Sequence, residues 1–322
     1  MKKILVTGAT GHLGRNLVEQ LSKENYQIIA AVRSTEKAKS SGLLDSVQVV
    51  TADLTNLNDV EHIISGVDIV VHAAANFSHW SPEPQKDIIE SNVKMSENVM
   101  IAAKKAGVEK VIYVSSIGAL ARTNNKVVTA YEWNLQTYGN PYFESKVVSE
   151  RLAWEKAVEL GVDMVAVLPG AMVGGPFDHQ TPTTKFLAAI KHGELPFDLD
   201  FEINLVDVVD ACDGIVKAIE NGIAGKRYIL ANEKGISISD INDFFRTRKP
   251  KLKRPIKVGK PILMAIASIA ECVGFLTKSE PQLLRSQVNF YYKTKENFDI
   301  SASIEDLSFT PKTSLACLED NF

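Results

Sequence analysis

The chain has 322 residues, 45% of them hydrophobic, which is enough for one large domain or two modest ones with packed cores. Its formal net charge of −3 gives no general attraction to nucleic acid, which excludes a strongly basic binding protein. The three cysteines, Cys212, Cys272 and Cys317, are odd in number and too widely spaced for a metal motif. We therefore expect a reduced, cytoplasmic protein without a metal site.

The first predicted elements are a strand over residues 2–6, the loop TGATGHLG and a helix whose apolar face includes Leu13 and Leu17. Gly8, Gly11 and Gly14 recur every third position in this loop, and glycine lets backbone come close to a ligand. The start of a helix presents unpaired N–H groups to an anion. The spacing differs from the usual G-x-G-x-x-G, but the strand–loop–helix context predicts binding of a dinucleotide phosphate.

Further apolar runs predict strands that alternate with helices along most of the chain. The strands are expected at 27–32, 47–50, 67–75, 111–116, 162–170 and 226–232. Helices are expected at 59–66, 96–107, 145–161 and 205–222. Because the strand runs are continuously apolar, they indicate strands buried on both faces of a parallel sheet. The fold class predicted is α/β, a doubly wound parallel Rossmann sheet.

The alternation of strands and helices ends after Pro169, which predicts a second domain. The Rossmann domain is expected over residues 1–169, completed by about 204–233, and a smaller C-terminal substrate-binding domain over 170–203 and 234–322. Residues 170–186 are expected to be rich in loops, and the chain from about residue 236 to be irregular and basic.

Two stretches of the C-terminal region admit more than one interpretation. The apolar run 261–276 is interrupted by Glu271 and falls short of a membrane span, so we expect a buried or lid helix and no integral membrane segment. A helix that touches a membrane surface remains the alternative. The basic run 246–254 is expected to be a solvated loop, although it could fold over the substrate pocket and hold phosphates.

The candidate catalytic residues follow the predicted strand 111–116. Ser116 lies at its carboxyl end, where ligands bind in open parallel sheets, and Tyr142 and Lys146 share one face of the next helix. A nearby ammonium favours a phenolate, so we expect Lys146 to lower the pKa of Tyr142. Tyr291 and Lys295 have the same spacing but follow no strand, and we do not expect them to be catalytic.

The segments TGATGHLG, HAAA, VSSIGAL, YFESK and LPGAMVGGP resemble the extended short-chain dehydrogenase/reductase family. The chain is most similar to its dihydroflavonol-reductase-like, NAD-dependent epimerase/dehydratase branch. The resemblance implies that Ser116, Tyr142 and Lys146 form the catalytic triad and that Asn92 shapes the active site. The cofactor contacts that we predict are Gly8, Thr10, Gly11, His12, Leu13, Gly14, Arg33, Lys37, Asp53, Leu54, Ala73, Ala74, Ala75, Ser115, Tyr142, Lys146, Pro169, Gly170, Met172 and Val173.

The end of the second strand bears on which nicotinamide cofactor is used. An acidic residue is expected about 20 positions after the glycine loop when the ribose 2′-hydroxyl is bound. Here Arg33 stands 19 positions after Gly14, followed by Lys37 and Lys39. An arginine fork suits a phosphate, so NADP(H) is predicted in preference to NAD(H).

These residues predict an NADPH-dependent reductase of a ketone or aldehyde, reversible as an alcohol dehydrogenase, in which Tyr142 protonates the carbonyl oxygen. The alternatives are an NAD-dependent sugar-nucleotide epimerase/dehydratase and an NADP(H)-sensing regulatory protein. The partner expected is a small apolar or aromatic carbonyl or alcohol compound, bound to a monomer or homodimer. The substrate pocket is expected to contain Phe77, Trp80, Ser116, Phe177 and Phe186.

Overall fold

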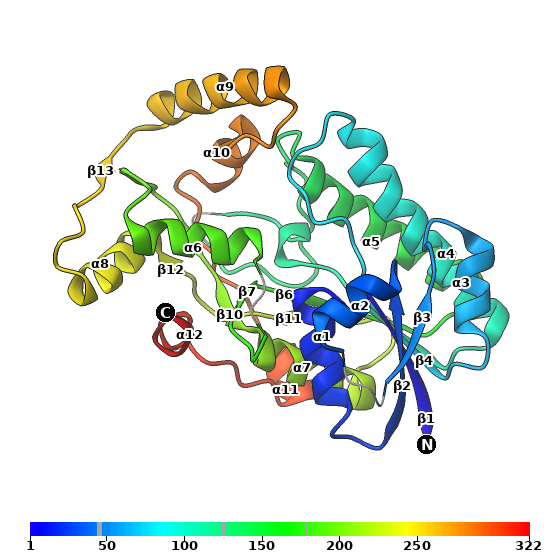
Figure 1. Ribbon diagram of the computed structural model, residues 1–322. Coiled ribbons are helices and arrows are strands. Elements are labelled where there is room, and N and C mark those ends of the chain that lie inside the picture. The colour runs from blue at the N-terminus through cyan, green and yellow to red at the C-terminus, as the bar shows by residue number, and fades with distance from the viewer. Residues whose placement is uncertain (44–46, 124–125, 178–179) are drawn as a thin grey trace.

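The computed structural model describes residues 1–43, 47–123, 126–177 and 180–322. Seven strands form its central sheet: β1 (Lys2–Thr7), β2 (Tyr26–Val32), β3 (Gln48–Thr51), β4 (Ile69–His72), β5 (Lys110–Val114), β6 (Met164–Pro169) and β11 (Arg227–Leu230). Their order is β11-β6-β5-β4-β1-β2-β3, and every neighbouring pair is parallel (Figure 1). The predicted doubly wound parallel sheet is therefore confirmed.

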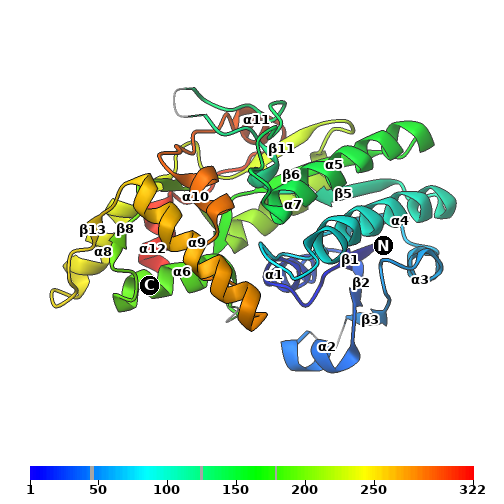
Figure 2. The same ribbon diagram turned by 90° about the horizontal axis from the view of Figure 1, so that it is seen from above.

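Helices cover both faces of the sheet, as Figure 2 shows from above. One face packs against α1 (His12–Leu21), α7 (Val208–Asn221) and α11 (Ser301–Leu307), and the other against α3 (Leu57–Ile64), α4 (Ser91–Ala106) and α5 (Pro141–Leu160). Side chains alternate between the two cores, because Ile4 and Val6 belong to the first and Leu5 to the second. All six residues of β6 are buried, which explains its continuous apolar run.

The carboxyl ends of the strands lie at one edge of the sheet. Thr7 is in register with both Ala31 and His72, and Val114 is in register with Val167. The chain moves from β1 outward to β2 and β3 and then returns to place β4 on the other side of β1. This reversal creates the crevice at which open parallel sheets bind ligands.

Residues after β6 build a further apolar core beside the sheet, from small strands and helices. Pro182 lies in the first turn of a helix, and the Thr181 side chain caps it by accepting from the Thr184 amide. The expectation of a loop-rich segment over 170–186 is therefore wrong for residues 171–173 and 182–186, which lie in a strand and in this helix. The elements are β7 (Ala171–Val173), α6 (Pro182–His192), β8 (Phe197–Asp198), β9 (Glu202–Ile203), β10 (Leu205–Asp207), β12 (Ile236–Ser237), α8 (Ile238–Arg248), β13 (Ile256–Lys257) and α12 (Ser314–Asn321).

The other described helices are α2 (Thr35–Ser41), α9 (Lys260–Thr277) and α10 (Arg285–Tyr291). Two expectations for the C-terminal region are wrong. The basic run 246–254 is not wholly a loop, because its first three residues form the last turn of α8. The expectation of a buried apolar helix is wrong, because only Leu263, Ala267 and Gly274 of α9 lie in the interior, and its alternative as a lid helix stays a prediction. The division into two domains stays a prediction.

Candidate active site

The glycine loop joins β1 to α1 at the crevice. Gly8 has φ +70°, and a Cβ built on it would lie 2.9 Å from both the nitrogen and the Cα of Ala74. A Cβ on Gly14 would lie 2.2 Å from the Gly8 carbonyl oxygen. Only glycine permits both approaches. Gly11 is the N-cap of α1 and offers no side chain to its first amides, so this helix start can accept an anionic group.

The loop after β4 is fixed to the glycine loop by a buried polar contact. The Ala74 amide donates to Thr7 Oγ1 at 3.1 Å, and Thr7 Oγ1 lies 3.0 Å from His72 Nδ1. Burial lowers the pKa of His72 to about 3, so this imidazole is neutral at physiological pH. His12 Nε2 lies 2.8 Å from the Gly174 carbonyl oxygen and connects α1 to the loop after β7.

A second part of the crevice lies beyond β2 and β3. Arg33 contributes to a cavity of about 570 Å³ together with Trp80 and Lys86. Hydrogen bonds from Thr55 lower the pKa of the Asp53 carboxyl, and the charge of Arg33 lowers it further. Asp53 therefore lies close enough to Arg33 to interact with it. The Lys37 side chain lies outside the part of the chain that the structure describes. The cavity is lined by Arg33, Asn76, Ser78, Trp80, Ser81, Lys86, Asp87, Ile88 and Ser91.

The predicted triad converges at the carboxyl end of β5. Ser116 accepts a hydrogen bond from the Gly118 amide at 3.0 Å, and its side chain also hydrogen-bonds the Tyr142 phenol. Tyr142 and Lys146 are buried one turn apart on α5. Lys146 Nζ extends toward the strand end and lies 3.5 Å from the Val114 carbonyl oxygen. The three side chains thus converge on one site.

Burial dominates the electrostatics of this site. It raises the pKa of Tyr142 to about 12, and the opposing effects of Ser116 and Arg122 are smaller. The expectation that the pKa of Tyr142 is lowered is therefore wrong. Burial lowers the pKa of Lys146 to about 8. At pH 7 the phenol is consequently protonated and can donate a proton, and the ammonium carries its charge.

The Asn92 side chain connects the loop after β4 to helix α5 by hydrogen bonds. Its Oδ1 accepts from the Asn76 amide at 2.7 Å, and its Nδ2 donates to Ser145 Oγ at 3.0 Å. Ser145 stands between Tyr142 and Lys146 on α5. Asn92 therefore positions both the loop and the helix that carry the site.

Aromatic side chains surround the Tyr142 ring. The ring centroid of Phe77 lies 4.5 Å from that of Tyr142, and the His79 centroid lies 4.8 Å away. Phe143 stacks on Phe290 at 3.8 Å. The group continues through Tyr291 and Phe201 to Phe186, with centroid distances between neighbours of 5.9 Å (Phe143 to Tyr291), 5.1 Å (Tyr291 to Phe201) and 6.1 Å (Phe201 to Phe186).

Comparison with known proteins places the chain in a family. A sequence model described as "NAD dependent epimerase/dehydratase family" matches residues 4–231, which is more than half of the chain. The chain belongs to this family. A putative dihydroflavonol 4-reductase of Synechocystis is 31% identical over 243 residues, 73% of this chain and 69% of the relative. Dihydroflavonol 4-reductase of Hordeum vulgare is 27% identical and covers 92% of this chain and 86% of the relative.

The predicted membership in the extended short-chain dehydrogenase/reductase family is confirmed by these matches, and the chain is an oxidoreductase enzyme of that family. A solved structure of yeast methylglyoxal/isovaleraldehyde reductase Gre2, complexed with NADPH, has a TM-score of 0.77 and 24% identity. The alignment covers 99% of this chain and 96% of Gre2. At this identity the likeness establishes the shared fold.

The predicted substrate residues of this epimerase/dehydratase family member are not all together. Phe77 lies directly against Tyr142, whereas Trp80 lines the cavity that contains Arg33. The Arg15 guanidinium lies 3.5 Å from the centre of the Phe177 ring, near the start of α1. Phe186 is connected to the aromatic side chains around Tyr142 through its contact with Phe201, which in turn lies beside Tyr291.

Sequence reasoning missed several residues near Tyr142. Asn140 caps α5, since its Oδ1 accepts from the Tyr142 amide at 3.1 Å, and it also lies 3.0 Å from His79 Nδ1. The Asn–Pro pair before this helix was a usable capping signal. Tyr291, dismissed as a catalytic candidate, lies beside Phe143. No local sequence pattern connects these two positions.

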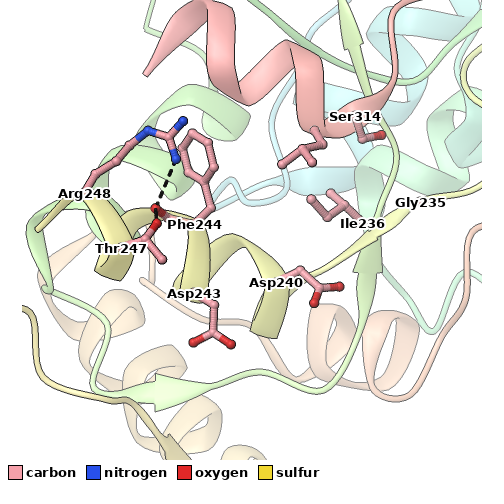
Figure 3. A pocket seen from close by; sticks show the side chains of 9 residues that line it. Gly235, Ile236, Asp240, Asp243, Phe244, Thr247, Arg248 and Ser314 are labelled. Carbon is pink, nitrogen blue, oxygen red and sulfur yellow. Dashed lines mark hydrogen bonds between the residues drawn. The ribbon is translucent and has the colours of Figure 1, made fainter. Parts of the chain in front are cut away.

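A further cavity lies between α8 and α12 and carries none of the triad residues (Figure 3). Its charged side chains already have partners. Asp240 accepts from Ser237 Oγ at 2.6 Å, and Asp243 accepts from Arg246 at 2.9 Å. Arg248 lies 3.6 Å from the centre of the Phe244 ring. Within the described residues no group of three histidine, cysteine or acidic side chains is arranged to hold a metal ion.

Proposed function

We propose that the protein is an NADPH-dependent reductase of apolar or aromatic ketones or aldehydes, reversible as an alcohol dehydrogenase. The observation that carries this proposal is the convergence of Ser116, Tyr142 and Lys146 at the carboxyl end of β5. These groups provide a protonated phenol, a hydroxyl to hold an oxygen and a buried cation. That set is suited to proton transfer at a carbonyl.

Each side chain has a distinct part in the proposed reaction. The bound nicotinamide cofactor supplies the hydride. Tyr142 donates its phenolic proton to the carbonyl oxygen, which Ser116 orients by a hydrogen bond. Lys146 holds the nicotinamide ribose and stabilises the phenolate that remains on Tyr142. Asn92 holds the loop after β4 and helix α5 in a fixed position relative to each other through its hydrogen bonds.

The residues around the crevice support a dinucleotide with a 2′-phosphate. The close approach of Gly8 to Ala74 and the open start of α1 suit a diphosphate. Arg33 and Lys86 line one cavity and are both suited to bind a further phosphate. The partly hydrogen-bonded carboxylate of Asp53 would remain to contact the adenosine. This arrangement supports NADP(H) in preference to NAD(H).

The aromatic side chains support an apolar substrate. Phe77, Phe143 and Tyr291 form part of the wall beside Tyr142, with His79 as one of its polar members. Rings of this kind favour flat or apolar groups by contact area and edge-to-face packing. We also propose that the enzyme works in the cytoplasm and that residues 170–203 and 234–322 form its substrate-binding domain.

The test is a screen of carbonyl compounds with purified protein, run with NADPH and NADH in parallel. The proposal predicts consumption of NADPH with bulky apolar ketones or aldehydes and little with nucleotide-diphosphate sugars. Conversion of nucleotide sugars alone, with NAD retained through purification, would establish the epimerase alternative instead. NADPH binding without turnover of any compound would indicate a sensing protein.

A further inference from the structure

Helix α9 is unusually apolar for an exposed helix. It has 18 residues and a mean hydropathy of 1.5, and only 17% of it is buried. By length and composition alone it could cross a membrane, and the expectation of no integral membrane segment stays a prediction. Its low burial also separates it from the core helices of soluble proteins, which can be equally apolar.

One side of α9 is attached to the protein along much of its length. Leu263 and Ala267 are buried together with Val288 of α10. Toward the other end, Glu271 accepts from Arg285 Nε at 2.6 Å, so the one acidic side chain of α9 is paired on the protein side. Figures 1 and 2 both show α9 lying alongside α10. The helix is therefore held against the surface and is not free to insert end-on.

The opposite side of α9 presents apolar side chains to solvent. Ile262, Ile269, Val273 and Leu276 follow helical spacing and share one face. Phe275 is also exposed, but it lies about 100° around the helix from Leu276. These five side chains are between 52% and 81% exposed. Exposed apolar groups gathered on one helix mark an interaction surface rather than a random surface feature.

A basic segment leads directly into this helix. Residues 246–260 contain eight lysines and arginines and no acidic residue. Lys251, Lys253 and Arg254 are exposed, whereas Arg248 is packed on Phe244 (Figure 3). Lys257 and Lys260 stand at the start of α9, where cations oppose the helix dipole, so stability of α9 does not explain them. Arg246 and Arg248 lie in the last turn of α8, where cations suit the dipole, and Arg246 donates to Asp243 at 2.9 Å. The eight are Arg246, Arg248, Lys249, Lys251, Lys253, Arg254, Lys257 and Lys260.

We propose that α9 and the basic segment 246–260 form a docking surface for an anionic lipid bilayer. The exposed face of α9 lies in the plane of the interface, and the cations contact lipid headgroups. Charge complementarity favours this partner, because exposed lysines and arginines beside an exposed apolar helix match anionic headgroups beside the acyl chains. The proposal concerns binding alone and does not depend on the proposed reductase activity.

The experiment is co-sedimentation of the full-length protein with vesicles of phosphatidylcholine alone and of phosphatidylcholine with an equal part of phosphatidylglycerol. We expect binding only to the anionic vesicles and its loss at high salt, because ions screen the attraction. The triple variant Lys251→Glu, Lys253→Glu, Arg254→Glu should lower the partition coefficient on the order of 100-fold, since each basic residue near such a surface contributes about five-fold.

The apolar contribution is tested separately. Leu276→Glu should weaken binding roughly ten-fold or more, because it removes an apolar group that is 80% exposed on this face and adds a negative charge. The matched control is Val158→Glu on α5, where the wild-type side chain is 83% exposed. It should bind as the wild type does. Thermal melting shows that each variant is folded.

Three results would overturn the proposal. The first is no binding of the wild type to anionic vesicles at low salt. The second is equal binding to both vesicle types with no effect of the triple variant. The third is a wild-type dimer, seen by light scattering, that Leu276→Glu converts to a monomer, because this would make the α9 face an interface between copies of the chain.

Discussion

Replacing Tyr142 with phenylalanine removes one hydroxyl group and keeps the ring in its aromatic surroundings. If the phenol is the proton donor, turnover should fall by about 10²–10⁴-fold, the usual contribution of general acid catalysis. This corresponds to roughly 3–5 kcal/mol in the activation free energy. Because burial raises the pKa of Tyr142 to about 12, no phenolate competes with the acid form at neutral pH.

The structure indicates that this variant keeps its fold. The phenylalanine ring can retain the packing against Phe77 and His79. Ser116 keeps the hydrogen bond that it accepts from the Gly118 amide at 3.0 Å. The free energy of unfolding should therefore fall only by the value of one hydrogen bond, about 0.5–1.5 kcal/mol. Loss of activity and loss of stability can thus be distinguished.

The assay is the initial rate of NADPH oxidation with a ketone that the wild type reduces, and cofactor affinity is followed by fluorescence titration. Tyr291→Phe is the matched control, because it removes the same group from another ring of the aromatic wall. It should retain kcat within about ten-fold, while affinity for NADPH is unchanged in both variants. An equal loss in the two variants, or near-normal turnover of Tyr142→Phe, would refute the assigned role.

Three further predictions concern the cofactor, the pH profile and the core. Arg33→Asp should weaken NADPH binding and improve relative use of NADH, measured as dissociation constants by titration; equal losses for both would contradict the 2′-phosphate role. Burial lowers the pKa of Lys146 from 10.5 to about 8, so its ammonium is present at pH 7 and is lost as the pH rises. The rate of ketone reduction, measured as a pH–rate profile, should therefore decline above about pH 8. Glu150→Ala removes the carboxylate that lies 2.7 Å from the buried Arg227 guanidinium. It should lower the free energy of unfolding, measured by urea denaturation, by about 3–5 kcal/mol. A loss under about 1 kcal/mol would show that this ion pair is not required for stability.

The parts of the molecule that could be predicted are those with local signals. The glycine loop, the strands and the Tyr142–Lys146 pair each depend on spacing within one or two elements. The start of α6 had such a signal in Thr181 and Pro182, but the surrounding glycines and prolines favoured a loop interpretation. No local sequence signal predicts the direction in which the pKa of Tyr142 shifts, because its burial depends on residues distant in the chain.

The substrate side of the site could be predicted least. Phe77 was expected near Tyr142 and lies beside it, yet Tyr291 reaches the same aromatic group from a helix near the end of the chain. Hydropathy identified the apolar residues of α9 but not which of its faces would be covered. Such contacts depend on how separate elements pack, which neither composition nor periodicity specifies.

The buried ion pair between Glu150 of α5 and Arg227 of β11 joins this helix to the last strand of the sheet. Glu150 accepts from the side chains of Ser115 and Arg227, and Arg227 donates as well to the Ala130 carbonyl oxygen. The triad and the glycine loop are already present once residue 146 has been translated, but Arg227 follows much later. A nascent chain that ends before β11 would hold a buried carboxylate without its counterion. We therefore expect a chain truncated before β11 to fail to assemble helix α5 as the full-length protein does.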